Sequence, residues 1–352
     1  MTTRREFIFQ TAAAGVAAAA SLRIPHATVA NAGKDDAKVG LAGVVETVLG
    51  PIDVSMLGFT LSHEHPCFIP PEDFPDRTVA AARMVKKLKE AKAGGVDTII
   101  DLSTADSLRD VRFGQEVARR SGMQIVAATG FRFAPESYKV QTVEQIAEFF
   151  IREIEQGIAD TGIKAGVIKA AAVSAKITAA EEKGFKAAAR ASKATGVPIE
   201  THTDAGNRGG EMQADFLEAE GVSPARVSLG HCDDTKDVNY LIGLAKRGYT
   251  IGIDHVFYGA TKAAKDEPGY VTYLRQIPWQ KRAEYVKRLI DAGFGDKIFL
   301  SNDWELEREK MNPDGFLFNT RKTIPYLKQL GVSQREIQAI MVDNPKRFFG
   351  RR

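Results

Sequence analysis

Cysteine is scarce in this sequence, and a long apolar run and an excess of one charge are both missing. Only two cysteines occur among 352 residues, so no disulfide framework is implied. Basic and acidic residues nearly balance, at 48 and 45, which gives no reason to expect nucleic acid or an anionic membrane as a partner. With 44% hydrophobic and 26% charged residues, the composition is that of a soluble globular protein.

The first 32 residues have the pattern of an export signal. Arg4 and Arg5 precede a weakly apolar stretch, residues 7–22, which is short of the about 20 apolar residues that a membrane span needs. A small-residue cleavage site follows at 30–32. We therefore expect a twin-arginine signal over 1–32, a periplasmic, secreted or membrane-associated protein without a stable span after cleavage, and one structured domain over 33–352. An N-terminal helix of that domain is the alternative.

Short apolar runs alternate with longer amphipathic segments from residue 59 onward. The runs predicted as strands are 59–62, 98–102, 124–129, 166–170, 198–201, 227–230, 250–253 and 298–301. The segments predicted as helices are 78–93, 107–121, 142–160, 179–195, 209–220, 235–247, 280–293 and a further helical region at 317–349. Before them a short β-hairpin is expected, with strands at 42–48 and 52–54 and its turn at Gly50-Pro51.

This alternation predicts an α/β fold with a parallel sheet. Eight units over about 290 residues fit a (β/α)8 TIM barrel that follows the N-terminal hairpin. A doubly wound open sheet is the alternative, but no Gly-x-Gly-x-x-Gly follows the first predicted strand.

The histidines fall at the strand ends. One of the six, His26, lies in the expected signal; each of the others sits at or just beyond the end of a predicted strand: His63, His65, His202, His231 and His255. In a (β/α)8 barrel these ends form the active-site face. The i, i+2 spacing of the first two directs both imidazoles to one face of a strand. Together with Asp303 they suit a zinc, manganese, iron or cobalt ion, although core packing is the alternative for any one of them.

Lys169 lies in an otherwise apolar strand, where a charged amine is costly unless it is paired or neutralised. Three interpretations are open from the residues. The amine forms a Schiff base, as in barrel aldolases; it reaches solvent as a structural lysine; or it is carboxylated by carbon dioxide and bridges two metal ions. The surrounding histidines favour the third.

At these positions the chain resembles the bacterial phosphotriesterases, also called aryldialkylphosphatases or parathion hydrolases, of the amidohydrolase superfamily. The likeness runs from about residue 44 to 349. It is carried by His63-Glu64-His65, Gly166-Val167-Ile168-Lys169, Thr201-His202-Thr203, Gly230-His231-Cys232-Asp233-Asp234, Ile253-Asp254-His255 and Ser301-Asn302-Asp303-Trp304.

The resemblance implies a binuclear, metal-dependent hydrolase that cleaves phosphotriesters (organophosphates) by attack of a metal-bridging hydroxide. It implies two divalent ions, zinc in the first place, N6-carboxylation of Lys169, small-molecule ester substrates and a homodimer. The implied metal ligands are His63, His65, Lys169, His202, His231 and Asp303. Asp303, His255 and Asp234 would form a catalytic proton relay.

The implied substrate pocket departs from the family pattern. Arg132 stands where phosphotriesterases carry a tryptophan, and it either caps the pocket, meets an anionic group of the substrate or points to solvent. The loop after Asp303 is short and charged. Four aromatic residues that follow strand ends are expected to line the pocket, with core packing as the alternative for the last of them: Phe133, Phe257, Tyr258 and Trp304.

Three other functions compete. A lactonase or carboxylesterase would use the same metal site, although the related lactonases have arginine where this chain has His255. A barrel aldolase would use Lys169, and a metal-binding protein without catalysis would need no relay.

Overall fold

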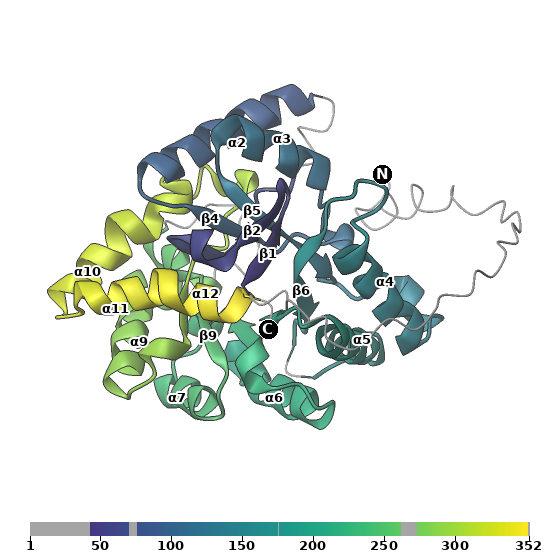
Figure 1. The fold of residues 1–352 in the computed structure, drawn as a ribbon. Coiled ribbons are helices and arrows are strands. Elements are labelled where there is room, and N and C mark those ends of the chain that lie inside the picture. Colours follow the sequence, from purple (N-terminus) through teal and green to yellow (C-terminus); the bar gives the residue numbers. More distant parts are fainter. Residues whose placement is uncertain (1–42, 70–75, 175, 262–272, 351–352) are drawn as a thin grey trace, which may run out of the picture. The chain divides into compact units, whose positions relative to one another are not determined.

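The computed structural model describes residues 43–69, 76–174, 176–261 and 273–350 (Figure 1). The expected signal and its cleavage site fall outside the described residues. No helix among the described residues is both long enough and apolar enough to cross a membrane.

Eight parallel strands form a nearly closed barrel, as predicted. They follow one another around the sheet in chain order: β3 (Thr60–Glu64), β4 (Thr98–Asp101), β5 (Gln124–Gly130), β6 (Ala165–Ala171), β7 (Ile199–His202), β8 (Val227–Gly230), β9 (Thr250–Ile253) and β10 (Ile298–Leu300). The last strand returns to the first, because the N–H of His63 donates to Ser301 Oγ at 2.9 Å and that of Asp303 donates to His63 O at 2.9 Å. Each strand lies within two residues of its predicted bounds.

Helices cover the outside of the barrel, one or more after most strands (Figure 1). They are α2 (Arg77–Ala93), α3 (Val111–Ser121), α4 (Val143–Glu155), α5 (Ala179–Thr195), α6 (Gly209–Ala219), α7 (Val238–Lys246) and α9 (Trp279–Asp291). The bounds of α5 are those predicted. Its first turn is fixed by a reciprocal pair of hydrogen bonds in which Thr178 caps the N–H of Glu181 and Glu181 accepts from the N–H of Thr178.

The helical region predicted at 317–349 is real but broken. It comprises α10 (Ile324–Gln329), α11 (Gln334–Gln338) and α12 (Asn344–Phe349), with wide π turns directly before α10 and α12. Pro325 and Pro345 lie at the starts of these two helices. Because proline has no N–H to donate, the regular helical hydrogen bonding cannot pass through it, which accounts for the wide turns.

The N-terminal hairpin pairs β1 (Val44–Thr47) with β2 (Gly50–Asp53), but its turn is not where the sequence suggested. The turn consists of Val48 and Leu49, and Gly50-Pro51 begins the second strand. Thr47 decides this, because its Oγ1 accepts from the N–H of Leu49 at 3.2 Å and donates to Gly50 O at 2.6 Å.

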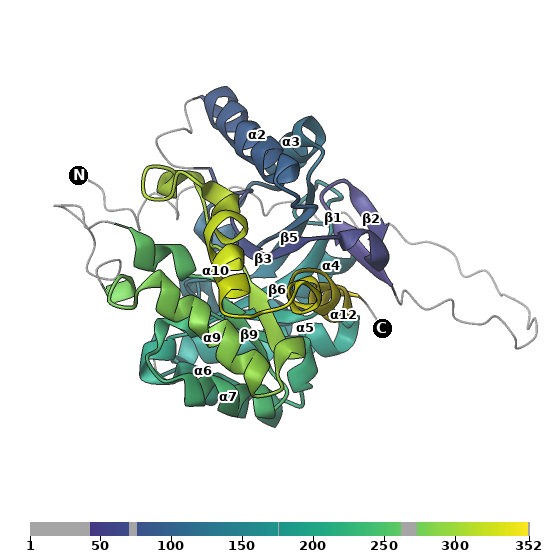
Figure 2. The ribbon, with the colours of Figure 1, turned by 90° about the vertical axis from the view of Figure 1, so that its left-hand side faces the viewer.

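The hairpin and α12 close one end of the barrel (Figure 2). Val45 from β1, Phe299 from β10 and Phe348 and Phe349 from α12 belong to one buried apolar cluster with side chains of β4, β5 and β6. Apolar side chains fill this end of the barrel. We therefore look for the functional site at the opposite end, where the strands reach their carboxyl termini.

Candidate metal centre

The six predicted ligands meet at the carboxyl end of the barrel. Lys169 lies within β6, His63 within β3, and His202 ends β7; His65, His231 and Asp303 come one to three residues after their strands. All are buried except His202, which is partly buried. His231 and Asp303 have left-handed backbones, with φ of 58° and 50°. Such strain in residues other than glycine is typical of functional positions.

Gly230 leaves the space that the closely packed ligand residues need. A Cβ on it would lie 2.4 Å from Thr201 O and 3.1 Å from the imidazole ring of His63. A side chain at this position would therefore displace either the backbone of β7 or the His63 ring, which explains why β8 ends on glycine just before His231.

The first ligand group consists of His63, His65 and Asp303. Asp303 Oδ1 lies 2.9 Å from His65 Nε2 and 3.7 Å from His63 Nε2, and Lys169 Nζ lies 3.1 Å from His63 Nε2. The three His and Asp residues offer ligand atoms that all lie within 4.8 Å of one another. That arrangement suits one divalent cation.

The second pair is His202 and His231, whose ring centroids are 4.3 Å apart. His202 Nδ1 and His231 Nε2 are buried, and neither has a hydrogen-bond partner among the described residues. Buried polar atoms without partners are rare in folded proteins. These two nitrogens are therefore candidates to bind an ion.

Burial favours the neutral form of three of these imidazoles. It lowers the pKa of His63, His202 and His231 well below the usual value, and the charge of Lys169 contributes at His63. Metal ions bind the neutral imidazole, so the donor set fits a divalent cation.

Asp254 holds the His231 ring by a hydrogen bond and lies close to the His63 ring, a role that sequence reasoning missed. Its Oδ1 accepts from His231 Nδ1 at 2.8 Å, and its Oδ2 lies 3.0 Å from His63 Nδ1. Carboxylates that hold the second nitrogen of a ligand histidine fix its tautomer and orientation. The sequence did contain a signal for this role: Asp254 directly follows β9, whose neighbour β8 ends just before the ligand His231.

Glu64 is the second residue that was missed. It has no exposed surface, and its carboxylate accepts from Ser301 Oγ at 2.7 Å, Asn302 N at 2.8 Å, Asn302 Nδ2 at 2.9 Å and Trp304 N at 2.8 Å. One side chain from β3 thus fixes the segment on both sides of Asp303.

Lys169 has no exposed surface, and burial together with the charge of Arg132 lowers its pKa to about 8. Gly130 pairs with it across β5 and β6 and has a φ of 107°, and a Cβ there would overlap Lys169 O. A lysine with a lowered pKa is partly neutral near pH 8, and the neutral amine is the form that reacts with carbon dioxide.

The proposed relay residues form a continuous chain of hydrogen bonds. His255 Nε2 lies 2.9 Å from Asp303 Oδ2, and His255 Nδ1 lies 2.8 Å from Asp234 Oδ2. Burial alone would lower the pKa of His255, but the two carboxylates outweigh it and raise the pKa to about 10. His255 is thus held between two acceptors, one facing the ligand group and one facing away from it.

Two arginines that the sequence did not reveal complete this chain. Arg282, fully buried in α9, donates to Asp234 Oδ1 at 2.6 Å and lies 3.0 Å from Asp233 Oδ2. Arg308, in the short charged loop, donates to Asp303 Oδ2 at 2.7 Å. Asp303 Oδ2 is therefore shared by His255 and Arg308.

The predicted pocket residues occupy different environments. Trp304 has no exposed surface: its ring centroid lies 4.6 Å from that of Phe316, and its Nε1 donates to Asn312 O at 3.2 Å, so it packs inside the protein. Phe133 is the opposite case, with 60% of its surface exposed. Arg132 is partly buried.

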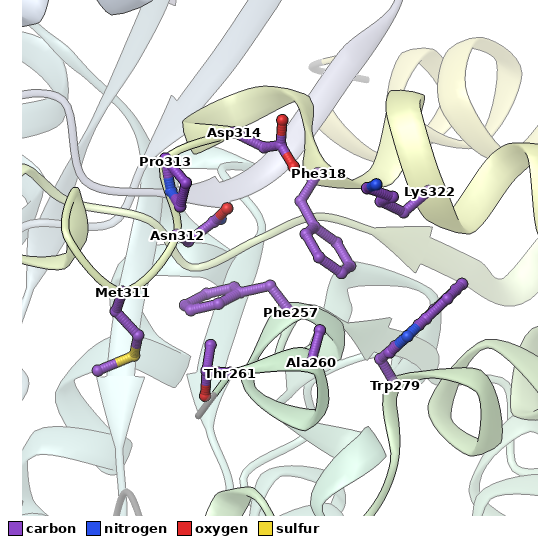
Figure 3. A pocket seen from close by; sticks show the side chains of 10 residues that line it. All are labelled: Phe257, Ala260, Thr261, Trp279, Met311, Asn312, Pro313, Asp314, Phe318 and Lys322. Atoms are coloured by element: carbon purple, nitrogen blue, oxygen red, sulfur yellow. The ribbon is translucent and has the colours of Figure 1, made fainter. Parts of the chain in front are cut away.

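Phe257 lines a cavity of about 330 Å³ (Figure 3). Figure 3 shows its ring and that of Phe318 from the C-terminal region turned toward the same space, with Trp279 from α9 nearby. The remaining lining residues are Ala260, Thr261, Met311, Asn312, Pro313, Asp314 and Lys322. None of the six predicted ligands borders this cavity. Tyr258, with 1% of its surface exposed, packs on the ring of Phe257, centroid to centroid at 4.2 Å.

Comparison with known proteins identifies the family of this chain. The phosphotriesterase family profile matches residues 43–349. A phosphotriesterase homology protein of Mycobacterium tuberculosis is 35% identical over 87% of this chain and 98% of its own length. An aryldialkylphosphatase of Saccharolobus solfataricus is 34% identical over 85% of this chain and 96% of its own. The solved structure of the phosphotriesterase from Mycobacterium tuberculosis has a TM-score of 0.78 at 36% identity, covering 88% of this chain and 98% of that one. Fold, histidine and carboxylate cluster, and sequence thus agree that this chain belongs to the phosphotriesterase family and is a hydrolase.

Proposed function

We propose that this chain hydrolyses phosphotriesters with a pair of divalent cations, zinc in the first place. The observation that carries the proposal is the convergence of neutral imidazoles, a carboxylate and a lysine of lowered pKa at one end of the barrel. His63, His65 and Asp303 would hold one ion, and His202 and His231 the other. Lys169, N6-carboxylated, would contribute an anion to both.

Two bound divalent ions would supply Lewis acidity and lower the pKa of a shared water. The residues of the chain then position and move protons. Asp303 Oδ2 lies 2.9 Å from His255 Nε2, and His255 Nδ1 lies 2.8 Å from Asp234 Oδ2, so the three residues would form the path by which a proton leaves the centre. Because its pKa of about 10 keeps both ring nitrogens of His255 protonated at neutral pH, the ring would take a proton from Asp303 only after it has released one. An aryloxide or enolate leaves without a general acid, so the site needs none on the leaving-group side.

The carboxylation step requires a neutral amine. The amine of Lys169 adds to carbon dioxide, a nitrogen–carbon bond forms, and one proton is released, which leaves a carbamate anion. Burial favours the neutral amine. Nζ already lies 3.1 Å from a nitrogen of the ligand His63, so the added group would be next to that ligand.

The second candidate is a lactonase or carboxylesterase with the same metal site. The observations that favour it are the burial of Trp304 and the charged loop that brings Arg308 onto Asp303, since neither offers an apolar aromatic wall at the centre. His255 favours the phosphotriesterase, because the related lactonases have arginine at that position.

Rates on paraoxon, a panel of lactones and a panel of aryl esters distinguish the two candidates. The protein is reconstituted with zinc, cobalt or manganese in the presence of bicarbonate. Preferred turnover of paraoxon, abolished by a chelator and restored by metal, supports the phosphotriesterase. Preferred turnover of a lactone or an ester, with the same chelator sensitivity, replaces it by the second candidate.

We also propose that residues 1–32 direct twin-arginine export to the periplasm. The paired arginines, the weakly apolar stretch and the small residues at 30–32 support this proposal. Fractionation and N-terminal sequencing of the exported protein test it, and replacement of Arg4 and Arg5 by lysine should leave the precursor in the cytoplasm.

A further inference from the structure

Arg132 stands at the edge of the candidate centre, in the loop that follows β5. The residue before it, Phe131, donates its N–H to Lys169 O at 3.0 Å. After burial, the charge of Arg132 is the largest influence that lowers the pKa of both Lys169 and His202. Arg132 also lies only two residues after Gly130, which pairs with the ligand Lys169 across β5 and β6.

The backbone around Arg132 is held by Asp106, from the loop after β4. Asp106 Oδ2 accepts from the N–H of Arg132 at 2.9 Å and from that of Phe133 at 2.6 Å. These contacts use backbone groups, so they position the loop without pairing the guanidinium. The ring of Phe133 lies 5.1 Å from the guanidinium carbon, which is a cation–π distance.

Other arginines of the site region have a carboxylate partner. The pairs are Arg109 with Glu153 at 2.7 Å, Arg282 with Asp234 at 2.6 Å and Arg308 with Asp303 at 2.7 Å. Within 43–69, 76–174, 176–261 and 273–350, no carboxylate forms an ion pair with Arg132, although this side chain is partly buried. A partly buried cation without a counter-ion is costly, so a counter-ion from a bound molecule would stabilise it.

We propose that Arg132 binds an anionic group of the substrate, a carboxylate in the simplest case, that lies apart from the scissile bond. The inference rests on the proposed ester hydrolysis and narrows its substrates to esters that carry a second, acidic group. The guanidinium offers two parallel donors to a carboxylate, a pairing that sets orientation as well as affinity. Neutral phosphotriesters and neutral esters would enter the same centre without an ionic contact to Arg132.

A matched pair of substrates tests the proposal. Metal-reconstituted protein is assayed on 4-nitrophenyl hydrogen glutarate, which is anionic, and on its methyl ester, which is neutral and has the same acyl chain. We expect kcat/KM to favour the anionic ester by roughly 10- to 100-fold, the usual effect of one hydrogen-bonded charge. In Arg132→Gln this ratio should fall toward one. Arg119→Gln, an equal change of charge on the exposed surface of α3, should keep the ratio of the unmodified protein.

Two results would overturn the proposal: an unmodified protein that prefers the neutral ester, or a preference that survives in Arg132→Gln. If neither ester is hydrolysed under any metal condition, the carboxylesterase candidate fails, turnover of paraoxon still decides the phosphotriesterase, and binding of glutarate decides the role of Arg132. Calorimetry should then show glutarate bound by the unmodified protein and at least 10-fold more weakly by Arg132→Gln. Equal binding to both would refute the anion site.

Discussion

Removal of the buried guanidinium of Arg282 should destabilise the barrel strongly. Arg282 is completely buried in α9 and donates to Asp234 Oδ1, Asp233 O and Leu274 O. It also lies 3.0 Å from Asp233 Oδ2. Arg282→Met keeps much of the side-chain volume but leaves the buried Asp233 without an ion pair among the described residues and leaves Asp234 with His255 alone.

The expected cost follows from that imbalance. Loss of one partner of a buried ion pair typically costs about 3–5 kcal/mol. With an unfolding entropy of about 2.1 cal/mol/K per residue over about 300 folded residues, this corresponds to a fall in Tm of roughly 5–8 °C. The effect should also reach the relay, because Asp234 is the residue that holds His255 Nδ1 at 2.8 Å.

Differential scanning calorimetry of the metal-free and metal-loaded protein measures the change. Arg288→Met, an exposed position on the same helix, is the control and should stay within about 0.5 kcal/mol of the unmodified protein. Adding Asp233→Asn to Arg282→Met removes the unpaired charge and should recover part of the loss. A Tm within 2 °C of the unmodified protein in Arg282→Met would refute the reasoning, since about 1 kcal/mol is too little for an unpaired buried carboxylate.

Two further predictions concern the centre itself. Lys169→Ala should lose bound metal and activity together, as measured by elemental analysis and turnover on the same samples; full activity without metal would contradict the assigned role. Gly230→Ala should lower Tm and metal affinity, because its Cβ would lie 2.4 Å from Thr201 O and overpacking costs about 1–3 kcal/mol. Gly243→Ala in α7 meets nothing within 4 Å and should retain metal content, so equal behaviour of the two variants would refute the steric argument.

The barrel could be predicted because its signals are local. Each strand is a short apolar run between helical patterns, and its bounds follow from residues close in sequence. The turn of the hairpin was placed wrongly because a single hydroxyl, that of Thr47, outweighs the general preference for a turn at Gly50-Pro51. Likewise, the π turns before Pro325 and Pro345 depend on individual missing N–H groups.

The supporting contacts of the centre could not be predicted in the same way, since they join distant segments. Glu64 and Asn302 are 238 residues apart, and no local pattern relates them. Arg282 did leave a signal: it shares the apolar stripe of α9 with Tyr285, Val286 and Leu289, at i, i+3, i+4 and i+7. A charged residue on a buried stripe requires a partner, and a second acidic residue beside Asp234 was available in the sequence.

The contacts of Glu64 with residues 301–304 have a consequence for folding. They join the first and last strands of the barrel across 237 to 240 residues of chain, so nearly all of the intervening chain must be in place before they form. Closing so long a loop carries a large entropy cost that is met late in folding. His63 and His65 lie on one side of this contact between β3 and β10, and Asp303 lies on the other. Tight metal binding should therefore begin only when the barrel closes. A bound ion should slow the separation of these two strands more than it slows unfolding elsewhere.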